Sequence, residues 1–271
     1  MRADLHTHSL YSFDGAPSAT VAAMCEAAIA AGLTHLAITD HCDIDGELDG
    51  IYHPLDRDAA FAAITEAKKI YADRLTLLAG LELGQAHHRP EAARAVLERH
   101  PYDIVLGSLH NLEGERDFYF FDFKGMTSDA IAAYFDRVLA EYDAMLDFPG
   151  IQVLTHITYV HRYVRRAGKE LDFIPFIPRI RALFEKMINK GIALELNTST
   201  MRPDGEGEPM PTKELLALYR RCGGRLVSLG SDGHAPDAVA RHFDHAARIL
   251  TECGFTELAV PTAQGLLTLP I

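Results

Sequence analysis

Short apolar runs alternate along the chain with longer segments whose apolar residues recur at helical spacing. The runs are rich in β-branched and leucine residues, which predicts strands, and the spacing of the longer segments predicts helices. We expect strands at 2–8, 33–41, 75–84, 102–110, 151–157, 191–198 and 225–234. We expect helices at 18–31, 57–73, 90–99, 127–147, 173–190, 212–222 and 236–252.

This alternation predicts an α/β fold built on a parallel sheet. The strands are apolar almost throughout, which indicates burial on both faces. No linker or change of composition interrupts the seven strand–helix units, so we expect a single domain over 1–271. The preferred architecture is one closed or nearly closed TIM-like (β/α)7 barrel. An open, doubly wound sheet is the alternative, although neither GxGxxG nor GxxxxGK[ST] is present to support nucleotide binding.

Residues that can bind metal ions follow six of the seven predicted strands. They are His6 and His8, Asp40 and His41, Glu82, His110, His156, and Asp232 and His234. The sixth strand instead ends in Asn197, and Asp14 lies just beyond the first strand. The carboxyl ends of parallel barrel strands meet at one rim, where active sites are built. We therefore expect these side chains to converge there.

The spacing within two of the groups strengthens this prediction. His6 and His8 are two residues apart, as are Asp232 and His234, so each pair can point to the same side of its strand. A lone histidine at a strand end is usually only hydrogen-bonded, but six at strand ends are hard to explain by chance. Four other histidines are interpreted as structural or solvent-facing: His35, His100, His242 and His245.

The candidate ligands are too numerous for one ion. They are His6, His8, Asp14, His41, Glu82, His110, His156, Asp232 and His234. A catalytic zinc site commonly uses three protein ligands. Nine ligands therefore suit two or three divalent ions, and imidazole with carboxylate favours Zn, Mn or Fe over Mg. Such ions lower the pKa of bound water towards ~7 and clamp phosphoester oxygens, so the pattern predicts phosphoester hydrolysis.

Composition narrows the class of protein. A formal net charge of −12 disfavours binding to nucleic acid through a basic surface. The four cysteines show no CxxC pairing and are interpreted as reduced thiols. The N-terminal residues show no apolar signal segment, and no uncharged apolar run is long enough to cross a bilayer. We expect a cytoplasmic protein without a membrane partner.

The motifs "DLHTHSLYSFDG", "ITDH", "GLELG", "GSLH", "LTHI" and "GSDGH", taken in order, resemble the polymerase and histidinol phosphatase superfamily. The resemblance runs from Asp4 to His234 and is greatest to the stand-alone histidinol-phosphate phosphatases of histidine biosynthesis. It implies a distorted seven-stranded barrel with a trinuclear metal site. It also implies hydrolysis of a small phosphorylated substrate, histidinol phosphate, to histidinol and phosphate.

The resemblance also implies a role for each ligand. His6, His8, Glu82 and Asp232 would bind the first metal, and Glu82 would bridge to a second that His110 and His156 complete. Asp14, His41 and His234 would hold the third. A metal-bridging hydroxide, held by Glu82 and Asp232, would be the nucleophile. No residue stands out as the acid for the leaving group.

Three residues are candidates for binding the substrate. Arg162 follows ligand His156 by six residues, and Arg202 lies on the loop after the sixth strand. Both resemble positions where histidinol-phosphate phosphatases carry phosphate-binding arginines, and a guanidinium suits bidentate contact with phosphate oxygens. His161, next to Arg162, completes the set.

Three other functions remain open at this point. A phosphodiesterase or nucleotide phosphatase would have the same metal ligands and differ only in its pocket. An amidohydrolase-type enzyme also opens with HxH, but it usually has a lysine where this chain has His110, and it lacks the glutamate of the third strand. The third alternative is a non-catalytic or proofreading module that serves a DNA polymerase. A degenerate version that only binds would be expected to lose ligands, and none is missing. The oligomeric state is not predicted.

Overall fold

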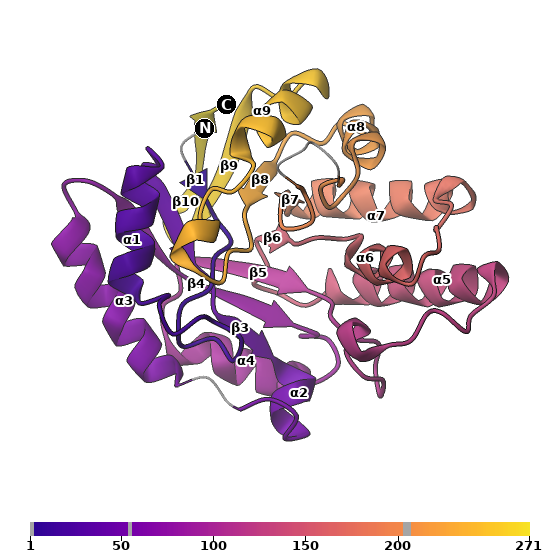
Figure 1. Cartoon of the computed structure of the whole chain (residues 1–271), viewed down its shortest axis with the longest axis horizontal. Coiled ribbons are helices and arrows are strands. Elements are labelled where there is room, and N and C mark those ends of the chain that lie inside the picture. The colour runs from indigo at the N-terminus through magenta and orange to yellow at the C-terminus, as the bar shows by residue number, and fades with distance from the viewer. Residues whose placement is uncertain (1–2, 54–55, 203–206) are drawn as a thin grey trace.

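The computed structural model describes residues 3–53, 56–202 and 207–271, and its centre is a parallel sheet (Figure 1). The neighbouring strands run in the order β1-β2-β4-β5-β6-β7-β8, and β3 pairs with β4. Their bounds are β1 Ala3–Asp4, β2 His35–Ile38, β3 His41–Asp43, β4 Thr76–Gly84, β5 Ile104–Ser108, β6 Val153–Leu154, β7 Ala193–Asn197 and β8 Val227–Gly230. An antiparallel pair follows, β9 Glu257–Thr262 and β10 Gly265–Pro270.

Helices surround the sheet (Figure 1). They are α1 Val21–Ala30, α2 Ile44–Leu48, α3 Arg57–Tyr71, α4 Pro90–Arg99, α5 Ser128–Met145, α6 Tyr159–Arg166, α7 Ile177–Lys190, α8 Lys213–Arg221 and α9 Phe243–Glu252. Three 3₁₀ turns add η1 Phe118–Phe120, η2 Ile174–Phe176 and η3 Pro236–Ala238. No helix among the described residues is long and apolar enough to cross a membrane.

The first and last strands of the sheet come together beyond their carboxyl ends. Thr7 forms a parallel bridge with Gly233, and the backbone N–H of Leu5 donates to the carbonyl of Leu229 at 2.9 Å. The N–H of His8 donates to the carbonyl of Gly233 at 2.8 Å. The sheet is thus nearly closed into a barrel, which confirms the predicted fold and excludes the open sheet.

The helix ends follow from local sequence. The Thr20 side chain accepts a hydrogen bond from the N–H of Ala23 at 3.1 Å, and Thr127 caps α5 in the same way at 3.2 Å. These caps satisfy N–H groups that the first turn of a helix leaves without partners. Gly191 ends α7 with a φ of 69°, a left-handed conformation that glycine adopts without steric cost.

Several predicted elements were wrong in detail. The strands expected over 2–8 and 151–157 are observed only at Ala3–Asp4 and Val153–Leu154. The helix expected over 236–252 is divided into η3 and α9, because Ala240 turns with a φ of 57° and its N–H donates to the buried carboxylate of Asp4 at 2.9 Å. The strand expected over 33–41 ends at Ile38, and a second strand, β3, begins at His41. The short helices α2 and α6 were not predicted.

Candidate metal centre

Glu82 lies at the centre of a group of histidines at the carboxyl ends of the strands. It is the seventh residue of β4, and its side chain is fully buried. Its Oε1 lies 3.0 Å from Nε2 of His156 and 3.3 Å from Nε2 of His110. Both histidines follow neighbouring parallel strands, β6 and β5, as the prediction of convergence at one rim requires.

The other oxygen of Glu82 faces a different set of histidines. Oε2 lies 2.8 Å from Nδ1 of His41, 3.3 Å from Nε2 of His6 and 3.6 Å from Nε2 of His8. His41 reaches Glu82 because the two residues are register partners between β3 and β4. One carboxylate therefore separates two groups of imidazoles, which is the geometry of a bridging ligand.

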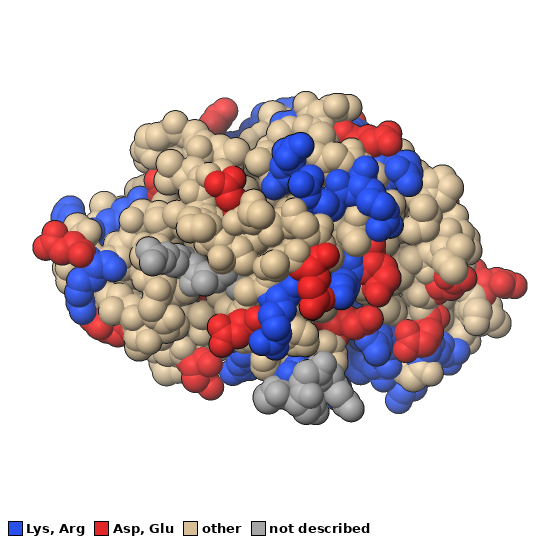
Figure 2. Space-filling model, turned by 90° about the horizontal axis from the view of Figure 1, so that it is seen from above, with Lys and Arg blue, Asp and Glu red and all other residues tan. Residues whose placement is uncertain are grey.

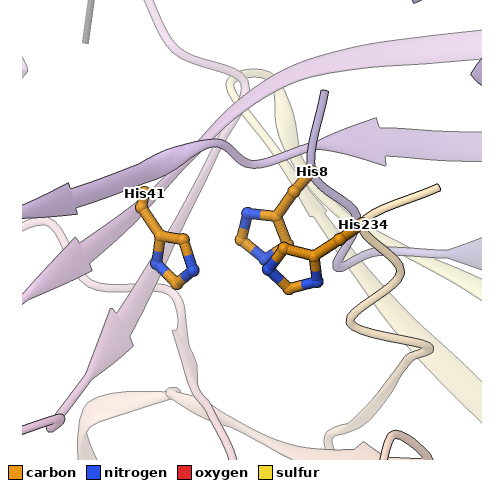
Figure 3. Close-up of side chains that lie close together, drawn as sticks. All are labelled: His8, His41 and His234. Atoms are coloured by element: carbon orange, nitrogen blue, oxygen red, sulfur yellow. The ribbon is translucent and has the colours of Figure 1, made fainter. Parts of the chain in front are cut away.

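The remaining predicted ligands complete the group. Asp232 Oδ1 lies 3.2 Å from Nε2 of His8, and Asp14 Oδ2 lies 3.0 Å from Nε2 of His234. Figure 3 shows the imidazoles of His8 and His234 side by side with that of His41 close to them. The ring centroid of His8 lies 4.1 Å from the ring centroid of His234 and 4.3 Å from that of His41. The structure thus brings all nine predicted ligands together.

The donor set fits divalent metal ions. Among the described residues, several buried nitrogen and oxygen atoms here lie close to charged groups but make no hydrogen bond of suitable geometry: His6 Nε2, His41 Nδ1, Glu82 Oε2 and His234 Nε2. Buried polar groups are normally paired, so orphaned atoms that converge call for an explanation. Four overlapping groups could each hold an ion: His8 with His41 and His234; His6 with His8 and Asp232; His6 with Glu82 and His156; and His41 with Asp43 and His110.

Electrostatics at this centre favour bound positive charge. Burial opposes charge on His6, but Glu195, Glu82 and Asp232 together raise its pKa well above the usual value. Burial likewise works against ionised Glu82, yet the surrounding histidines hold the pKa of its carboxyl well below the usual range. Carboxylates buried this deeply require cations close by. Divalent metal ions would supply the positive charge that these carboxylates require, as protonated histidines would.

The backbone is strained at two of the ligands. Asp232 has a φ of 55° and His156 a φ of 21°, in the left-handed region that residues other than glycine rarely adopt. Such strain costs on the order of 1–3 kcal/mol per residue and persists where the surrounding structure fixes it, commonly at functional sites. From these positions His156 contacts Glu82 at 3.0 Å and Asp232 contacts His8 at 3.2 Å.

Glu195 is a functional residue that the sequence prediction missed. It lies on β7, is buried, and its Oε1 accepts a hydrogen bond from Nδ1 of His6 at 2.6 Å. Its Oε2 accepts from the backbone N–H of His156 at 2.9 Å. With the Nδ1 proton of His6 held in this way, Nε2 points to the metal centre. The signal was a glutamate inside the buried run "IALELNTS", since buried charges are rarely unpaired.

Asp43 has the same role at His110. It is buried at the end of β3, and its Oδ1 accepts a hydrogen bond from Nδ1 of His110 at 2.7 Å. That contact leaves Nε2 of His110 facing Glu82. Asp43 follows ligand His41 by two residues, and this spacing on a strand was the available signal.

A glycine lies against each of these orienting carboxylates. A Cβ atom on Gly230 would lie 2.4 Å from Oε1 of Glu195, and one on Gly84 would lie 2.4 Å from Oδ1 of Asp43. Both distances are far inside van der Waals contact. The absence of a side chain at Gly84 and Gly230 therefore makes room for the carboxylates that hold His110 and His6.

The three predicted substrate-binding residues line a cavity of about 910 Å³ between α6 and the segment after β7. His161, Arg162 and Arg202 lie on its wall with Arg165, Arg166 and Glu170. Within the described parts of the chain, none of the nine ligands lines this cavity. Two residues of the cavity wall lie close to the metal centre. Thr158 follows His156 by two residues, and Ser199 donates at 2.7 Å to Asn197, whose amide in turn donates to Asp232 at 3.3 Å.

On the face that Figure 2 shows, acidic and basic side chains are interspersed over much of the surface, and several Lys and Arg side chains gather towards its upper right. The histidines predicted to be structural have ordinary surroundings. His100, for example, contacts Asp58 at 2.8 Å, and Nδ1 of His35 lies 2.9 Å from the hydroxyl of Thr34.

Known proteins of similar sequence cover almost the same length. The chain is 27% identical over 260 residues to a probable histidinol-phosphatase of Clostridium acetobutylicum, covering 92% of this chain and 93% of the relative. It is 26% identical over 261 residues to a histidinol-phosphatase of Lactococcus lactis subsp. lactis, covering 94% and 93%.

A solved structure has the same fold. Histidinol phosphate phosphatase from Lactococcus lactis subsp. lactis, complexed with zinc, L-histidinol and phosphate, superposes with a TM-score of 0.80 at 23% identity, covering 98% of each chain. The model of the PHP domain family matches residues 4–199. This match spans well over half of the 271 residues and contains seven of the nine ligands. The chain belongs to the PHP domain family.

Proposed function

We propose that this protein is a metal-dependent phosphomonoester hydrolase that converts histidinol phosphate and water to histidinol and phosphate. The observation that carries the proposal is the buried carboxylate of Glu82 between two groups of histidines. Two relatives that match over more than nine-tenths of this chain, named histidinol-phosphatase and probable histidinol-phosphatase, support the substrate. We propose one domain over residues 1–271.

Two of the three proposed ligand sets share Glu82. His6, His8, Glu82 and Asp232 would hold one ion, and Glu82, His110 and His156 a second. Asp14, His41 and His234 would hold a third. Two to three ions of the zinc, manganese or iron class fit this mixture of imidazole and carboxylate. When bound, such ions supply Lewis acidity towards phosphate oxygens and hydroxide near neutral pH.

The protein's own residues position the reactants. Glu195 and Asp43 hold the rings of His6 and His110 through their Nδ1 atoms. Arg162 and Arg202 would contact phosphate oxygens from the cavity beside the centre, where guanidinium groups suit bidentate binding. His161 would contact the organic part of the substrate from the same wall.

The cavity also suits a substrate that carries positive charge next to its phosphate. Glu170 and Glu208 lie on its wall, where Arg165 contacts both carboxylates at 3.5 Å and 3.2 Å. A wall that contains arginines and glutamates together can complement both the phosphate and the ammonium of an amino-alcohol phosphate. The backbone of a nucleic acid, which carries phosphates without ammonium groups, would offer no such pairing of charges. The lack of a membrane partner stays a prediction. The cytoplasmic location stays a prediction.

The experiment that tests the proposal is steady-state hydrolysis of a phosphate-ester panel by metal-replete protein. The panel contains histidinol phosphate, a nucleoside monophosphate, an aryl monoester and a diester. We expect kcat/KM for histidinol phosphate to exceed the others by roughly a hundredfold or more, because polar contacts to a substrate discriminate strongly. Equal values for histidinol phosphate and the aryl monoester would contradict the substrate. A preference for the diester would indicate a phosphodiesterase on the same scaffold.

A further inference from the structure

A second group of histidines and carboxylates lies outside the nine ligands. His87 and His88 follow β4, and Glu141 lies on α5. Nε2 of His87 lies 2.6 Å from Oε2 of Glu141, and Nε2 of His88 lies 2.5 Å from the same oxygen. Two imidazole nitrogens from adjacent residues therefore converge on one carboxylate oxygen.

Two of these side chains, His88 and Glu141, are held by a second contact. Nδ1 of His88 donates to Oδ2 of Asp45 at 2.6 Å, and the amide of Asn111 donates to the same Asp45 oxygen at 3.1 Å. The other oxygen of Glu141 accepts from the backbone N–H of Glu113 at 3.3 Å. An imidazole fixed through one nitrogen by a carboxylate, with its other nitrogen pointed at a common position, is the usual arrangement of a metal-binding histidine.

The charge of the group also calls for a cation. Asp45 and Glu141 are mostly buried, with side-chain exposures of 10% and 20%, and the His88 side chain is 1% exposed. Arg89 is half exposed, and its Nε lies 3.8 Å from Oδ1 of Asp45. Nδ1 of His87 and Oδ1 of Asp45 have no hydrogen-bond partner among the described residues. Buried carboxylates of this kind are stabilised by a proton on His88 or by a metal ion.

We propose that His87, His88 and Glu141 form an additional metal site for a zinc-class divalent ion, separate from the nine-ligand centre. Two imidazoles and one carboxylate match the ligand types that zinc prefers, and they leave a fourth position for water. Tetrahedral zinc with ligands at about 2.0–2.1 Å needs donor atoms about 3.3 Å apart, so the three side chains must separate by less than about 1 Å.

The ion would join three segments that support the catalytic rim. These are the loop after β4, the body of α5, and, through Asp45, the helix α2. Asp45 follows the orienting residue Asp43 by two positions, and Asn111 follows ligand His110. The site therefore acts as a structural brace. It requires none of the nine ligands, so its presence does not depend on the proposed phosphatase activity.

Metal analysis of matched variants tests this site. Wild type, Glu141→Gln and His87→Ala are loaded with Zn²⁺, dialysed against metal-free buffer and analysed for zinc per chain. His100→Ala is the control, because His100 also contacts a carboxylate but has no second imidazole beside it. We expect each site variant to hold one zinc ion fewer than wild type and His100→Ala to match wild type. Phosphatase activity, measured in zinc, should be retained in all variants.

Wild-type crystals give an independent measurement that needs no substitution. Anomalous difference maps collected above the zinc edge should show a peak between Nε2 of His87, Nε2 of His88 and Glu141. Folded variants with the zinc content of wild type would overturn the proposal, as would the lack of that peak in crystals whose nine-ligand centre is loaded. Either result would assign the group to an ion pair of a protonated His88 and would leave the phosphatase proposal intact.

Discussion

The carboxylate of Glu195 accepts a hydrogen bond from Nδ1 of His6 at 2.6 Å, although the two residues are 189 positions apart in the sequence. The contact joins the strand β7 to the segment after β1, on two sides of the barrel closure. It fixes which nitrogen of His6 faces Glu82. Of the seven strands predicted from the sequence, β7 is the one that no predicted ligand follows, and it contributes to the centre by orienting a ligand from another strand.

Replacement of this carboxylate should weaken the centre without unfolding the barrel. In Glu195→Gln we expect metal affinity and kcat/KM to fall by roughly 10- to 100-fold, because a neutral amide holds the His6 ring less firmly. Metal titration and steady-state kinetics measure the effect. Glu252→Gln, which alters an exposed ion pair with Lys213, serves as the control. Wild-type metal affinity in Glu195→Gln would show that the contact has no orienting role.

The space that Gly230 leaves for Glu195 gives a second prediction. Gly230→Ala should lower metal affinity, as Glu195→Gln does, because the new methyl group would lie 2.4 Å from the carboxylate oxygen of Glu195 and 2.5 Å from the Cβ of His6, the ligand that Glu195 orients. Gly125→Ala is the matched control, because a Cβ there meets no atom within 4 Å. Metal titration measures the affinity of both variants. Equal affinities in the two would mean that β7 and β8 adjust without moving Glu195.

The cavity arginines should act on substrate binding and not on metal binding. In Arg162→Ala and Arg202→Ala we expect KM for histidinol phosphate to rise roughly tenfold to a hundredfold, the loss of a charged hydrogen bond of about 1.5–3 kcal/mol. Metal content should remain that of wild type. Arg181→Ala, an exposed arginine on α7, is the control. Loss of metal from either cavity variant would contradict the role of that arginine in substrate binding and would show that it supports the metal centre instead.

The barrel depends on apolar packing between its outer helices. Phe184 of α7 is fully buried, and its ring centroid lies 5.2 Å from that of Tyr219 on α8 in an edge-on contact. Phe184→Ala should lower the free energy of unfolding by about 3–5 kcal/mol through lost burial and the resulting cavity. Denaturant unfolding of metal-loaded protein measures it. Ile174→Ala, at a position 77% exposed, should change little, and a similar loss in both would contradict this packing.

The ligands could be predicted from the sequence because they follow strands whose carboxyl ends meet by topology. Glu195 and Asp43 could not, since their roles depend on contacts with His6 and His110 that only the closed barrel creates. The helix over 236–252 was predicted as continuous because the spacing of apolar residues reports only on neighbours in the sequence. The buried carboxylate of Asp4, 236 positions away from Ala240, interrupts it. Long-range polar contacts of this kind leave no periodic signal in a single sequence.

The most direct test of the centre around Glu82 is the kcat/KM for histidinol phosphate of chelator-stripped protein, measured before and after addition of Mn²⁺ or Zn²⁺. We predict that the stripped protein is inactive, that added metal restores activity, and that Glu82→Gln recovers little under the same treatment, since it loses the bridging charge. Full activity in stripped protein, with metal analysis confirming that no ion remains, would contradict the account.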